Sequence, residues 1–269
     1  MYLGVPPSSP ALAPFVESLW YFESAQPPGR ELVLPSGAMQ LLVNLHADEL
    51  RTHEGAEVRR LSGAALQGAR STAGMIDTAQ QRSIVGVAFK PGGAHPFTAI
   101  SPSAIAENLV ELDVLWGRDG AVLRDRLLSA GTPRRVLRTL EHALLSRMVE
   151  PSRPDPTIAF ALAAFEHGAG VAAVADKLGM TSKRFGRRFA DQVGLSPKRF
   201  SRVRRLQRLL GSVNSGRETD WAQLAVECGY YDQSHLIHEF RALTGLCPTQ
   251  YRPRSRWEHN HVPLAASAA

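Results

Sequence analysis

The chain has few cysteines and no long apolar run. Cys228 and Cys247 are the two cysteines among 269 residues, so one chain cannot form a disulfide framework or a four-cysteine zinc site. The longest uncharged stretches, 1–16, 32–47 and 91–106, contain Pro, Gly or Ser and are shorter than the roughly 18 apolar residues of a membrane-spanning helix. The N-terminus lacks a basic segment before an apolar core, which argues against a signal peptide. The sequence therefore predicts a cytoplasmic protein that does not bind a membrane.

Patterns typical of enzymes and metal sites are also scarce. His46, His53 and His95 stand apart, without the close spacing of zinc ligands. The sequence has neither the phosphate-loop pattern GxxxxGK(S/T) nor the nucleophile pattern GxSxG. We therefore predict no cofactor, no bound metal and no enzymatic activity. One alternative stays open, in which residues 1–150 are an enzyme domain that a basic C-terminal domain tethers to nucleic acid.

The two halves of the chain differ in charge. Residues 1–150 carry 14 basic and 15 acidic side chains, a net charge of −1. Residues 151–269 carry 17 basic and 10 acidic side chains, a net charge of +7. A basic half beside a neutral one indicates a polyanionic partner for the basic half.

A proline-rich stretch separates the two halves. Pro151, Pro154 and Pro156 lie within six residues and favour an extended linker over a continuous helix. The chain ends in small residues, which is typical of a disordered terminus. We therefore divide the chain into an N-terminal domain, a linker, a second domain and a disordered tail, at residues 1–150, 151–155, 156–254 and 255–269.

The first domain changes from a strand pattern to a helix pattern along the chain. Apolar and β-branched residues at 83–90 give its clearest strand, which stops at a Pro-Gly-Gly turn. The other predicted elements are strands at 31–34 and 39–45, a short helix running into a strand at 10–22, and amphipathic helices at 119–129 and 133–149. Strands followed by helices predict an α+β domain.

The second domain is predicted to be all-α, with an internal repeat. Helices are expected at 156–166, 171–178, 182–193, 197–210, 221–227 and 232–244, each followed closely by a glycine. A unit of a short helix, a glycine turn and a longer helix occurs twice. In the longer helix of each unit, two apolar residues lie four positions apart on one face, Phe185 and Phe189 in the first and Leu236 and Phe240 in the second. This arrangement is typical of two helix-turn-helix motifs.

The longer helix of the first motif and the segment after it are strongly basic. Ten basic side chains and one acid, Asp191, lie between positions 183 and 208. Arg184, Arg187 and Arg188 share a helix face through their spacing of three and four residues. Arginine suits guanine edges and phosphates, so the pattern favours binding to double-stranded DNA. The alternatives are a solvated surface on an ordinary helical bundle and a packaging protein without sequence preference.

Two stretches of the second domain carry a family resemblance. Residues 195–200 have the sequence LSPKRF, and residues 228–236 have the sequence CGYYDQSHL, followed by Phe240, Gly245 and Pro248. With these stretches, the domain resembles the DNA-binding domain of the AraC/XylS family of bacterial transcription regulators. The resemblance implies two helix-turn-helix motifs joined by a long helix.

The resemblance also implies which residues contact DNA. Recognition helices at about 182–193 and 232–244 are expected to enter successive major-groove segments, about one duplex turn apart. The candidate DNA-contacting residues are Ser182, Lys183, Arg184, Gly186, Arg187, Arg188, Arg204, Gln233, Ser234, Ile237 and His238. Gly186, in the first motif, offers no side chain where the family often has a polar one. Ile237 and His238 depart from the residues common in the family, so the second motif is expected to rely more on shape, methyl contact or phosphate. Gln233 is its best base-reading candidate, since an amide pairs with adenine.

Three short stretches of the first domain, 35–38, 61–68 and 89–94, resemble the N-terminal domain of one subgroup of AraC-like regulators, whose ligand is unknown. The resemblance implies a sensor or dimerisation domain. The expected partners besides DNA are a small-molecule effector, RNA polymerase and a second copy of the chain through residues 1–150. The aromatic side chains of this domain suit either an apolar ligand pocket or a packed core. We therefore predict a sequence-specific transcription regulator whose activity the N-terminal domain modulates.

Overall fold

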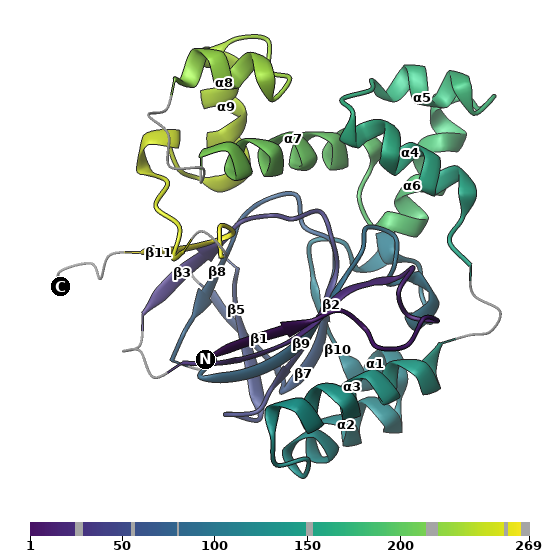
Figure 1. Ribbon diagram of the computed structural model, residues 1–269, viewed down its shortest axis with the longest axis vertical. Helices are drawn as coiled ribbons and strands as arrows, with labels where there is room; N and C mark the ends of the chain where they lie inside the picture. Colours follow the sequence, from purple (N-terminus) through teal and green to yellow (C-terminus); the bar gives the residue numbers. More distant parts are fainter. Residues whose placement is uncertain are drawn as a thin grey trace.

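The computed structural model describes residues 1–24, 29–54, 57–79, 81–148, 153–213, 220–255 and 258–264. Strands dominate the N-terminal part of the chain and helices the C-terminal part (Figure 1). This arrangement confirms the prediction of an α+β domain followed by an all-α domain. The predicted linker begins at residues 151 and 152, which lie outside the described residues, so the domain division there stays a prediction.

The strands of the described residues form three antiparallel sheets. The strands are β1 (Tyr2–Val5), β2 (Val16–Glu23), β3 (Arg30–Val33), β4 (Gln40–Asn44), β5 (Glu49–Glu54), β6 (Glu57–Ser62), β7 (Ala64–Gln67), β8 (Gly74–Asp77), β9 (Ser83–Phe89), β10 (Leu109–Glu111) and β11 (His261–Leu264). One sheet has the order β1-β2-β9-β4-β7-β10, a second has the order β11-β3-β8, and β5 pairs with β6. Strand β9 is paired on both sides and buried on both faces, which explains its continuous apolar sequence.

In the part of the chain that the structure describes, three α-helices close the N-terminal part. They are α1 (Leu112–Trp116), α2 (Arg118–Leu128) and α3 (Pro133–Arg147), preceded by the 3-10 turns η1 (His95–Phe97) and η2 (Pro102–Ile105). Helix α3 contacts β2, and α1 and α2 contact β7. The helices therefore gather on one side of the six-stranded sheet, away from the C-terminal helices (Figure 1).

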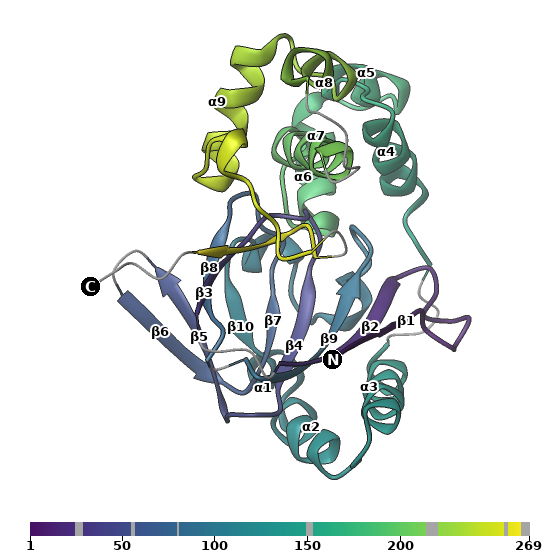
Figure 2. The same cartoon turned by 60° about the vertical axis from the view of Figure 1, so that its left-hand side comes forward.

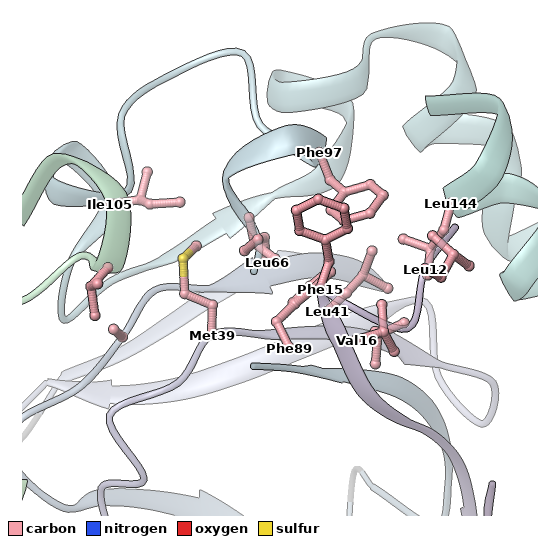
Figure 3. Packing of buried hydrophobic residues seen from close by; sticks show 14 of the residues in the cluster. Leu12, Phe15, Val16, Met39, Leu41, Leu66, Phe89, Phe97, Ile105 and Leu144 are labelled. Atoms are coloured by element: carbon pink, nitrogen blue, oxygen red, sulfur yellow. The ribbon is translucent and has the colours of Figure 1, made fainter. Parts of the chain in front are cut away.

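The core of the N-terminal part is tightly filled with aromatic and aliphatic side chains. Phe89 and Phe97 have ring centroids 5.4 Å apart, and Phe15 meets Phe97 edge-on at 6.3 Å (Figure 3). The indole Nε1 of Trp116 donates a hydrogen bond to the Phe97 carbonyl at 2.7 Å. These aromatic rings are at most 5% exposed. The structure therefore assigns them to core packing, one of the two roles that the sequence left open.

The predicted helix at the start of residues 10–22 is wrong. Residues 10–15 form turns that lead directly into β2. Leu12 and Phe15 are buried at 0% and 3% exposure and anchor these turns in the core. Proline at positions 10 and 14 restricts the backbone there, and burial of the two apolar side chains determines the path instead.

Glu141 of α3 holds the loop between β1 and β2. Its side chain is 7% exposed and accepts hydrogen bonds from the Ser8 amide at 2.6 Å, the Ser8 hydroxyl at 2.6 Å and the Ser9 amide at 2.8 Å. Burial of the carboxylate raises its pKa, but these hydrogen bonds together lower the pKa by more than burial raises it. The pKa of Glu141 therefore lies below its ordinary value. The ionised carboxylate is therefore the form that stabilises the folded state.

We expect Glu141→Gln to lower the free energy of unfolding at pH 7 by about 1–3 kcal/mol, because the hydrogen bonds lose a charged acceptor. A pKa that is lower in the folded than in the unfolded state gives stability above the unfolded pKa, and this stability is lost as the pH falls through the folded pKa. The difference between wild type and variant should therefore shrink from about pH 5 downward. Urea unfolding over a pH series measures this difference in the free energy of unfolding. A difference that stays constant with pH would exclude a stabilising role for the ionised Glu141 carboxylate.

The C-terminal part has six α-helices in its described residues. They are α4 (Pro156–Glu166), α5 (Val171–Lys177), α6 (Ser182–Val193), α7 (Pro197–Val213), α8 (Trp221–Glu227) and α9 (Gln233–Thr244), followed by the turn η3 (Pro248–Gln250). Helix α7 lies across the N-terminal strands, with α4–α6 at one end and α8–α9 at the other (Figure 1). Among the described helices, none is long and apolar enough to cross a membrane.

The prediction of a disordered C-terminal tail is wrong for its described residues. Strand β11 pairs antiparallel with β3, with Val262 opposite Leu32. Arg254 and His261 both contact the carboxylate of Glu31 on β3, which is 4% exposed. Pairing with a strand about 230 residues earlier orders this short segment, whose local sequence carries little strand signal. The chain after α9 thus returns to the N-terminal part (Figure 2).

The N-terminal part contacts the C-terminal helices along the length of α7. A Cβ at Gly37 would lie 3.3 Å from both Phe200 and Val203 of α7. The amide Nε2 of Gln207, also on α7, donates to the Pro35 carbonyl at 2.8 Å. One hydrophobic cluster runs from the N-terminal sheet into α4–α7, and a second joins Leu34 to α7, α8 and α9. The two parts therefore share their cores.

Candidate nucleic-acid interface

The first helix-turn-helix unit consists of α5, a glycine turn and α6. Gly179 has φ +63° in the turn, a conformation that favours glycine. Thr181 caps α6, and its side chain accepts a hydrogen bond from the Arg184 amide at 3.3 Å. Phe185 and Phe189 lie on the inner face of α6 and are fully buried. Local capping and the buried pair thus fix which face of α6 is turned outward.

The outward face of α6 is exposed and basic. Ser182, Lys183 and Arg184 are exposed, and the Arg187 side chain is 87% exposed. A Cβ at Gly186 would meet no atom within 4 Å, so the backbone is open to close approach there. These five predicted residues therefore lie together on one accessible surface.

A hollow of about 690 Å³ lies on this surface. Its lining residues are Asp155, Thr181, Lys183, Arg184, Arg187, Arg188, Asp191 and Gln192. Four cationic side chains face two carboxylates, and the N-terminus of α6 adds a partial positive charge. The electrostatics of the hollow therefore favour an anion such as a phosphate group.

Arg188 differs from the other cations of α6 because Asp155 holds its guanidinium. The distances from Asp155 Oδ2 are 3.0 Å to Arg188 Nε and 2.8 Å to Nη2. Asp155 also caps α4 by accepting from the Thr157 amide at 2.8 Å. Burial raises the pKa of Asp155, but the hydrogen bonds that it accepts from Arg188 and Thr157 together lower the pKa by more than burial raises it. The pKa of Asp155 therefore lies below its ordinary value. The ion pair joins α6 to the start of α4.

Arg204 is engaged inside the helical part. Its Nε lies 2.6 Å from Glu166 Oε1, and its Nη2 lies 3.1 Å from Glu166 Oε2. This two-point contact joins α7 to the end of α4. The assignment of Arg204 to DNA stays a prediction, and any DNA contact would have to compete with Glu166.

Arg202 and Arg205 also make internal contacts. Both lie on α7 and reach Glu239 of α9, with N–O distances of 2.6 and 3.2 Å. Glu239 is 7% exposed, so this network fixes α9 against the connecting helix. The basic run between positions 183 and 208 therefore divides into residues exposed on α6 and at the start of α7, and arginines further along α7 that form internal ion pairs.

The second helix-turn-helix unit repeats the construction with α8, a turn and α9. Gly229 has φ +83° in the turn, and Asp232 caps α9 by accepting from the His235 amide at 2.7 Å. Asp232, predicted as the first residue of this helix, is therefore its cap. Leu236 and Phe240 are buried at 0% and 1% exposure. As in the first unit, the apolar pair turns the opposite face outward.

The outward face of α9 carries the four residues predicted for the second motif. Gln233, Ser234, Ile237 and His238 are all exposed. Arg241 lies one turn beyond Ile237 and is exposed as well. This face is less basic than that of α6, so it offers fewer contacts for phosphates.

The C-terminal ends of α6 and α9 both contact the N-terminal part. A Cβ at Gly194, after α6, would lie 3.1 Å from the Cβ of Ala69. The Leu243 carbonyl in the last turn of α9 accepts a hydrogen bond from the Ala73 amide at 2.8 Å. The N-terminal halves of both helices, which carry the predicted DNA-contacting residues, project away from these contacts.

Several residues that position the interface were not identified from the sequence. Asp155 and Glu239 hold α6 and α9, and the hydroxyls of Ser101 and Ser103 donate to Asp191 Oδ1 at 3.2 and 3.0 Å. The Asp-Pro pair before α4 signals a helix cap, whereas the other contacts join residues far apart in sequence. In the described residues, no group of three or more His, Cys, Asp or Glu side chains is arranged to hold a metal ion.

Two known family models each match a part of the chain. Residues 174–254 match a family described as a helix-turn-helix domain. Residues 5–111 match a family described as a domain of unknown function. No curated protein matches the chain at a significant level.

Solved structures of ToxT from Vibrio cholerae are similar to the chain. One covers 84% of this chain and 96% of that chain, with 8% identity and a TM-score of 0.47. A second, bound to (E)-4-(8-methylnaphthalen-1-yl)but-3-enoic acid, covers 87% and 97% with 8% identity and a TM-score of 0.47. A third, bound to an unsaturated fatty acid, covers 87% and 90% with 11% identity and a TM-score of 0.39.

Proposed function

We propose that α6 and α9, which belong to an AraC-type helix-turn-helix domain, read a specific DNA sequence in successive major-groove segments. The protein is a DNA-binding transcription regulator. The observation that carries the finer proposal is the exposed basic face of α6, opposite the buried Phe185 and Phe189. A helix with this division of faces suits the major groove.

In the first motif, Arg187 and Lys183 are the proposed base-reading residues. The Arg187 side chain is exposed to solvent, and its Nε lies 3.9 Å from the Asp191 carboxylate. Its guanidinium can donate to the two hydrogen-bond acceptors on the major-groove edge of guanine. Arg184 and Ser182, near the helix N-terminus, suit phosphate contacts. The bare backbone at Gly186 allows a close approach to the groove.

In the second motif, Gln233 is the proposed base-reading residue, since its amide can pair with adenine. Ser234 and His238 share the adjacent exposed row and suit polar or phosphate contacts. Ile237 is 39% exposed and suits contact with a thymine methyl group. Arg204 is proposed to contact DNA in competition with Glu166, which binds its guanidinium and joins α7 to α4.

The N-terminal part is proposed to modulate DNA binding, because it contacts both motifs and the helix between them. A bound effector, RNA polymerase or a second copy of the chain through residues 1–150 would act by favouring one arrangement of the two parts. The cytoplasm is the proposed location, where chromosomal DNA is accessible to such a regulator.

We expect Arg187→Ala to weaken binding to a selected duplex by about 1–3 kcal/mol, because a base contact is lost. Binding to a scrambled duplex of the same length should change much less. Fluorescence anisotropy with both duplexes, at physiological salt, measures the two affinities. Arg138→Ala, which removes an exposed arginine from α3, is the matched control and should change neither affinity. Equal losses on both duplexes for Arg187→Ala would contradict its base-reading role.

A further inference from the structure

One five-residue segment of the N-terminal part contacts the C-terminal ends of both recognition helices. This bridging segment, residues 69–73, lies between β7 and β8. Ala69 at one end packs against Gly194 after α6, and the Ala73 amide at the other end donates to the Leu243 carbonyl of α9. Leu243 lies in the last turn of α9, where carbonyls have no partner within the helix. The bridging segment therefore supplies a missing partner to α9 while it contacts the end of α6.

Glu107 holds the bridging segment through its backbone and its side chain. Its amide donates to the Ala69 carbonyl at 3.0 Å. Its carboxylate accepts from the Ser71 amide at 3.0 and 3.1 Å and from the Ser71 hydroxyl. Ser71 is 8% exposed, so water does not readily replace these bonds. Glu107 thus fixes two alternate residues of a segment that is otherwise neither helix nor strand.

The backbone of Glu107 is strained. Its φ is +64°, and it is the only non-glycine residue with a positive φ among the described residues. A side chain in this region costs about 1 kcal/mol or more, and such residues persist where the surrounding contacts determine the conformation. The contacts to Ala69 and Ser71 are the ones that hold Glu107 here.

Glu107 also faces the connecting helix. Its Oε1 lies 3.8 Å from Arg199 Nη1, in the first turn of α7. The preceding residues Ser101 and Ser103 bind Asp191 near the end of α6. The loop that carries Glu107 therefore touches α6 and α7 directly and reaches α9 through the bridging segment.

We propose that Glu107 is a positioning residue for DNA recognition, which fixes the bridging segment and thereby the separation of α6 and α9. This inference rests on the proposed function. Two helices that enter successive major-groove segments must be held at a separation that matches the duplex, so the spacing between the two half-sites follows from the protein. Loosening the bridging segment should relax the preferred spacing without changing the sequence of either half-site.

The test compares full-length wild type with Glu107→Gly and Glu107→Gln. The glycine variant removes the carboxylate and relieves the strain at positive φ, whereas the glutamine variant keeps one acceptor for the Ser71 amide. Each protein selects duplexes from a random-sequence library, and sequencing gives the distribution of spacings between the half-sites. Glu111→Ala is the matched control, since Glu111 accepts from the Ser62 amide at 2.7 Å in the same way but lies away from the bridging segment.

We expect one dominant spacing for wild type and Glu111→Ala, several spacings for Glu107→Gly, and an intermediate result for Glu107→Gln. Affinity for the wild-type spacing should fall about five- to tenfold in Glu107→Gly, a typical coupling between sites. A single unchanged spacing in Glu107→Gly, or an equal broadening in Glu111→Ala, would overturn the positioning role.

A second measurement does not require DNA. Spin labels at Ala172→Cys on α5 and Gln223→Cys on α8, with Cys228 and Cys247 replaced by alanine, report the separation of the two motifs. We expect a narrow distance distribution in the wild-type background and a broad one with Glu107→Gly. If Glu107→Gly broadens the distance distribution but the wild type selects no shared DNA sequence, the positioning role is retained and the reading of DNA sequence is rejected. An unchanged distribution would reject the positioning role even where a DNA sequence is selected.

Discussion

Replacing Phe165 by alanine is expected to lower the free energy of unfolding by about 3–5 kcal/mol. Phe165 of α4 is 1% exposed and lies at the centre of an aromatic cluster. Its ring centroid is 5.6 Å from that of Phe189, 6.3 Å from that of Phe200 and 6.4 Å from that of Phe185. Removing the ring leaves a cavity where α4, α6 and α7 meet. Because two of these phenylalanines form the buried face of α6, the variant should also lose DNA binding.

Phe160→Ala is the matched control for Phe165→Ala. Phe160 lies on the same helix but is 42% exposed, so its removal should cost well under 1 kcal/mol. Urea unfolding, followed by both circular dichroism and tryptophan fluorescence, measures both variants and shows whether the two parts of the chain unfold together. Similar losses for the two phenylalanines would contradict the central place of Phe165 in the core.

Gly68→Ala is expected to destabilise the protein by about 3 kcal/mol or more, because the added methyl group collides with backbone. A Cβ at Gly68 would lie 1.8 Å from the Ile105 carbonyl oxygen and 2.6 Å from its carbon. The Gly68 amide also donates to the Asn108 carbonyl at 2.8 Å. These contacts hold the start of the bridging segment beside the loop that carries Glu107, so neither backbone can move away cheaply.

Gly211→Ala gives the opposite expectation with the same chemical change. Gly211 lies inside α7, and a Cβ there would meet no atom within 4 Å. Alanine should stabilise the helix by about 0.5–1 kcal/mol, since glycine is the poorer helix former. Thermal and urea unfolding of both variants compare the two signs. Stabilisation by Gly68→Ala would contradict the close backbone approach at Ile105.

The helices of the C-terminal part were predicted well because their signals are local. Helices α4, α6 and α8 have the predicted bounds, since a polar cap precedes each one and a glycine follows. Helix α7 continues three residues past the predicted end, to Val213, through Gly211. Glycine within a helix costs only about 1 kcal/mol, and burial of Leu209 and Leu210 in the second cluster favours the continued helix.

The N-terminal part and the tail were predicted less completely because their contacts are non-local. The sequence indicated β3, β4 and β9, but β1 is short and acquires its pairing only from β2. Strand β11 pairs with β3 across almost the whole chain. Strand pairing between distant segments leaves little signal in either segment alone.

The candidate DNA interface follows the same division. The exposed face of α6 was predicted from the spacing of Phe185 and Phe189, which fixes the opposite face geometrically. The internal ion pair of Arg204 with Glu166 was not, since it joins residues 38 positions apart. The bridging segment and Glu107 also lay beyond sequence patterns, because their importance comes from contacts with two separate helices.

Reading of DNA by two helices is tested most directly by footprinting full-length wild type on duplexes that it selects from a random-sequence library at physiological salt. We expect the selected duplexes to share a two-part sequence, with two protected major-groove segments about one duplex turn apart. Selection of duplexes without a shared sequence, or protection of a single segment, would contradict the reading of DNA by both α6 and α9.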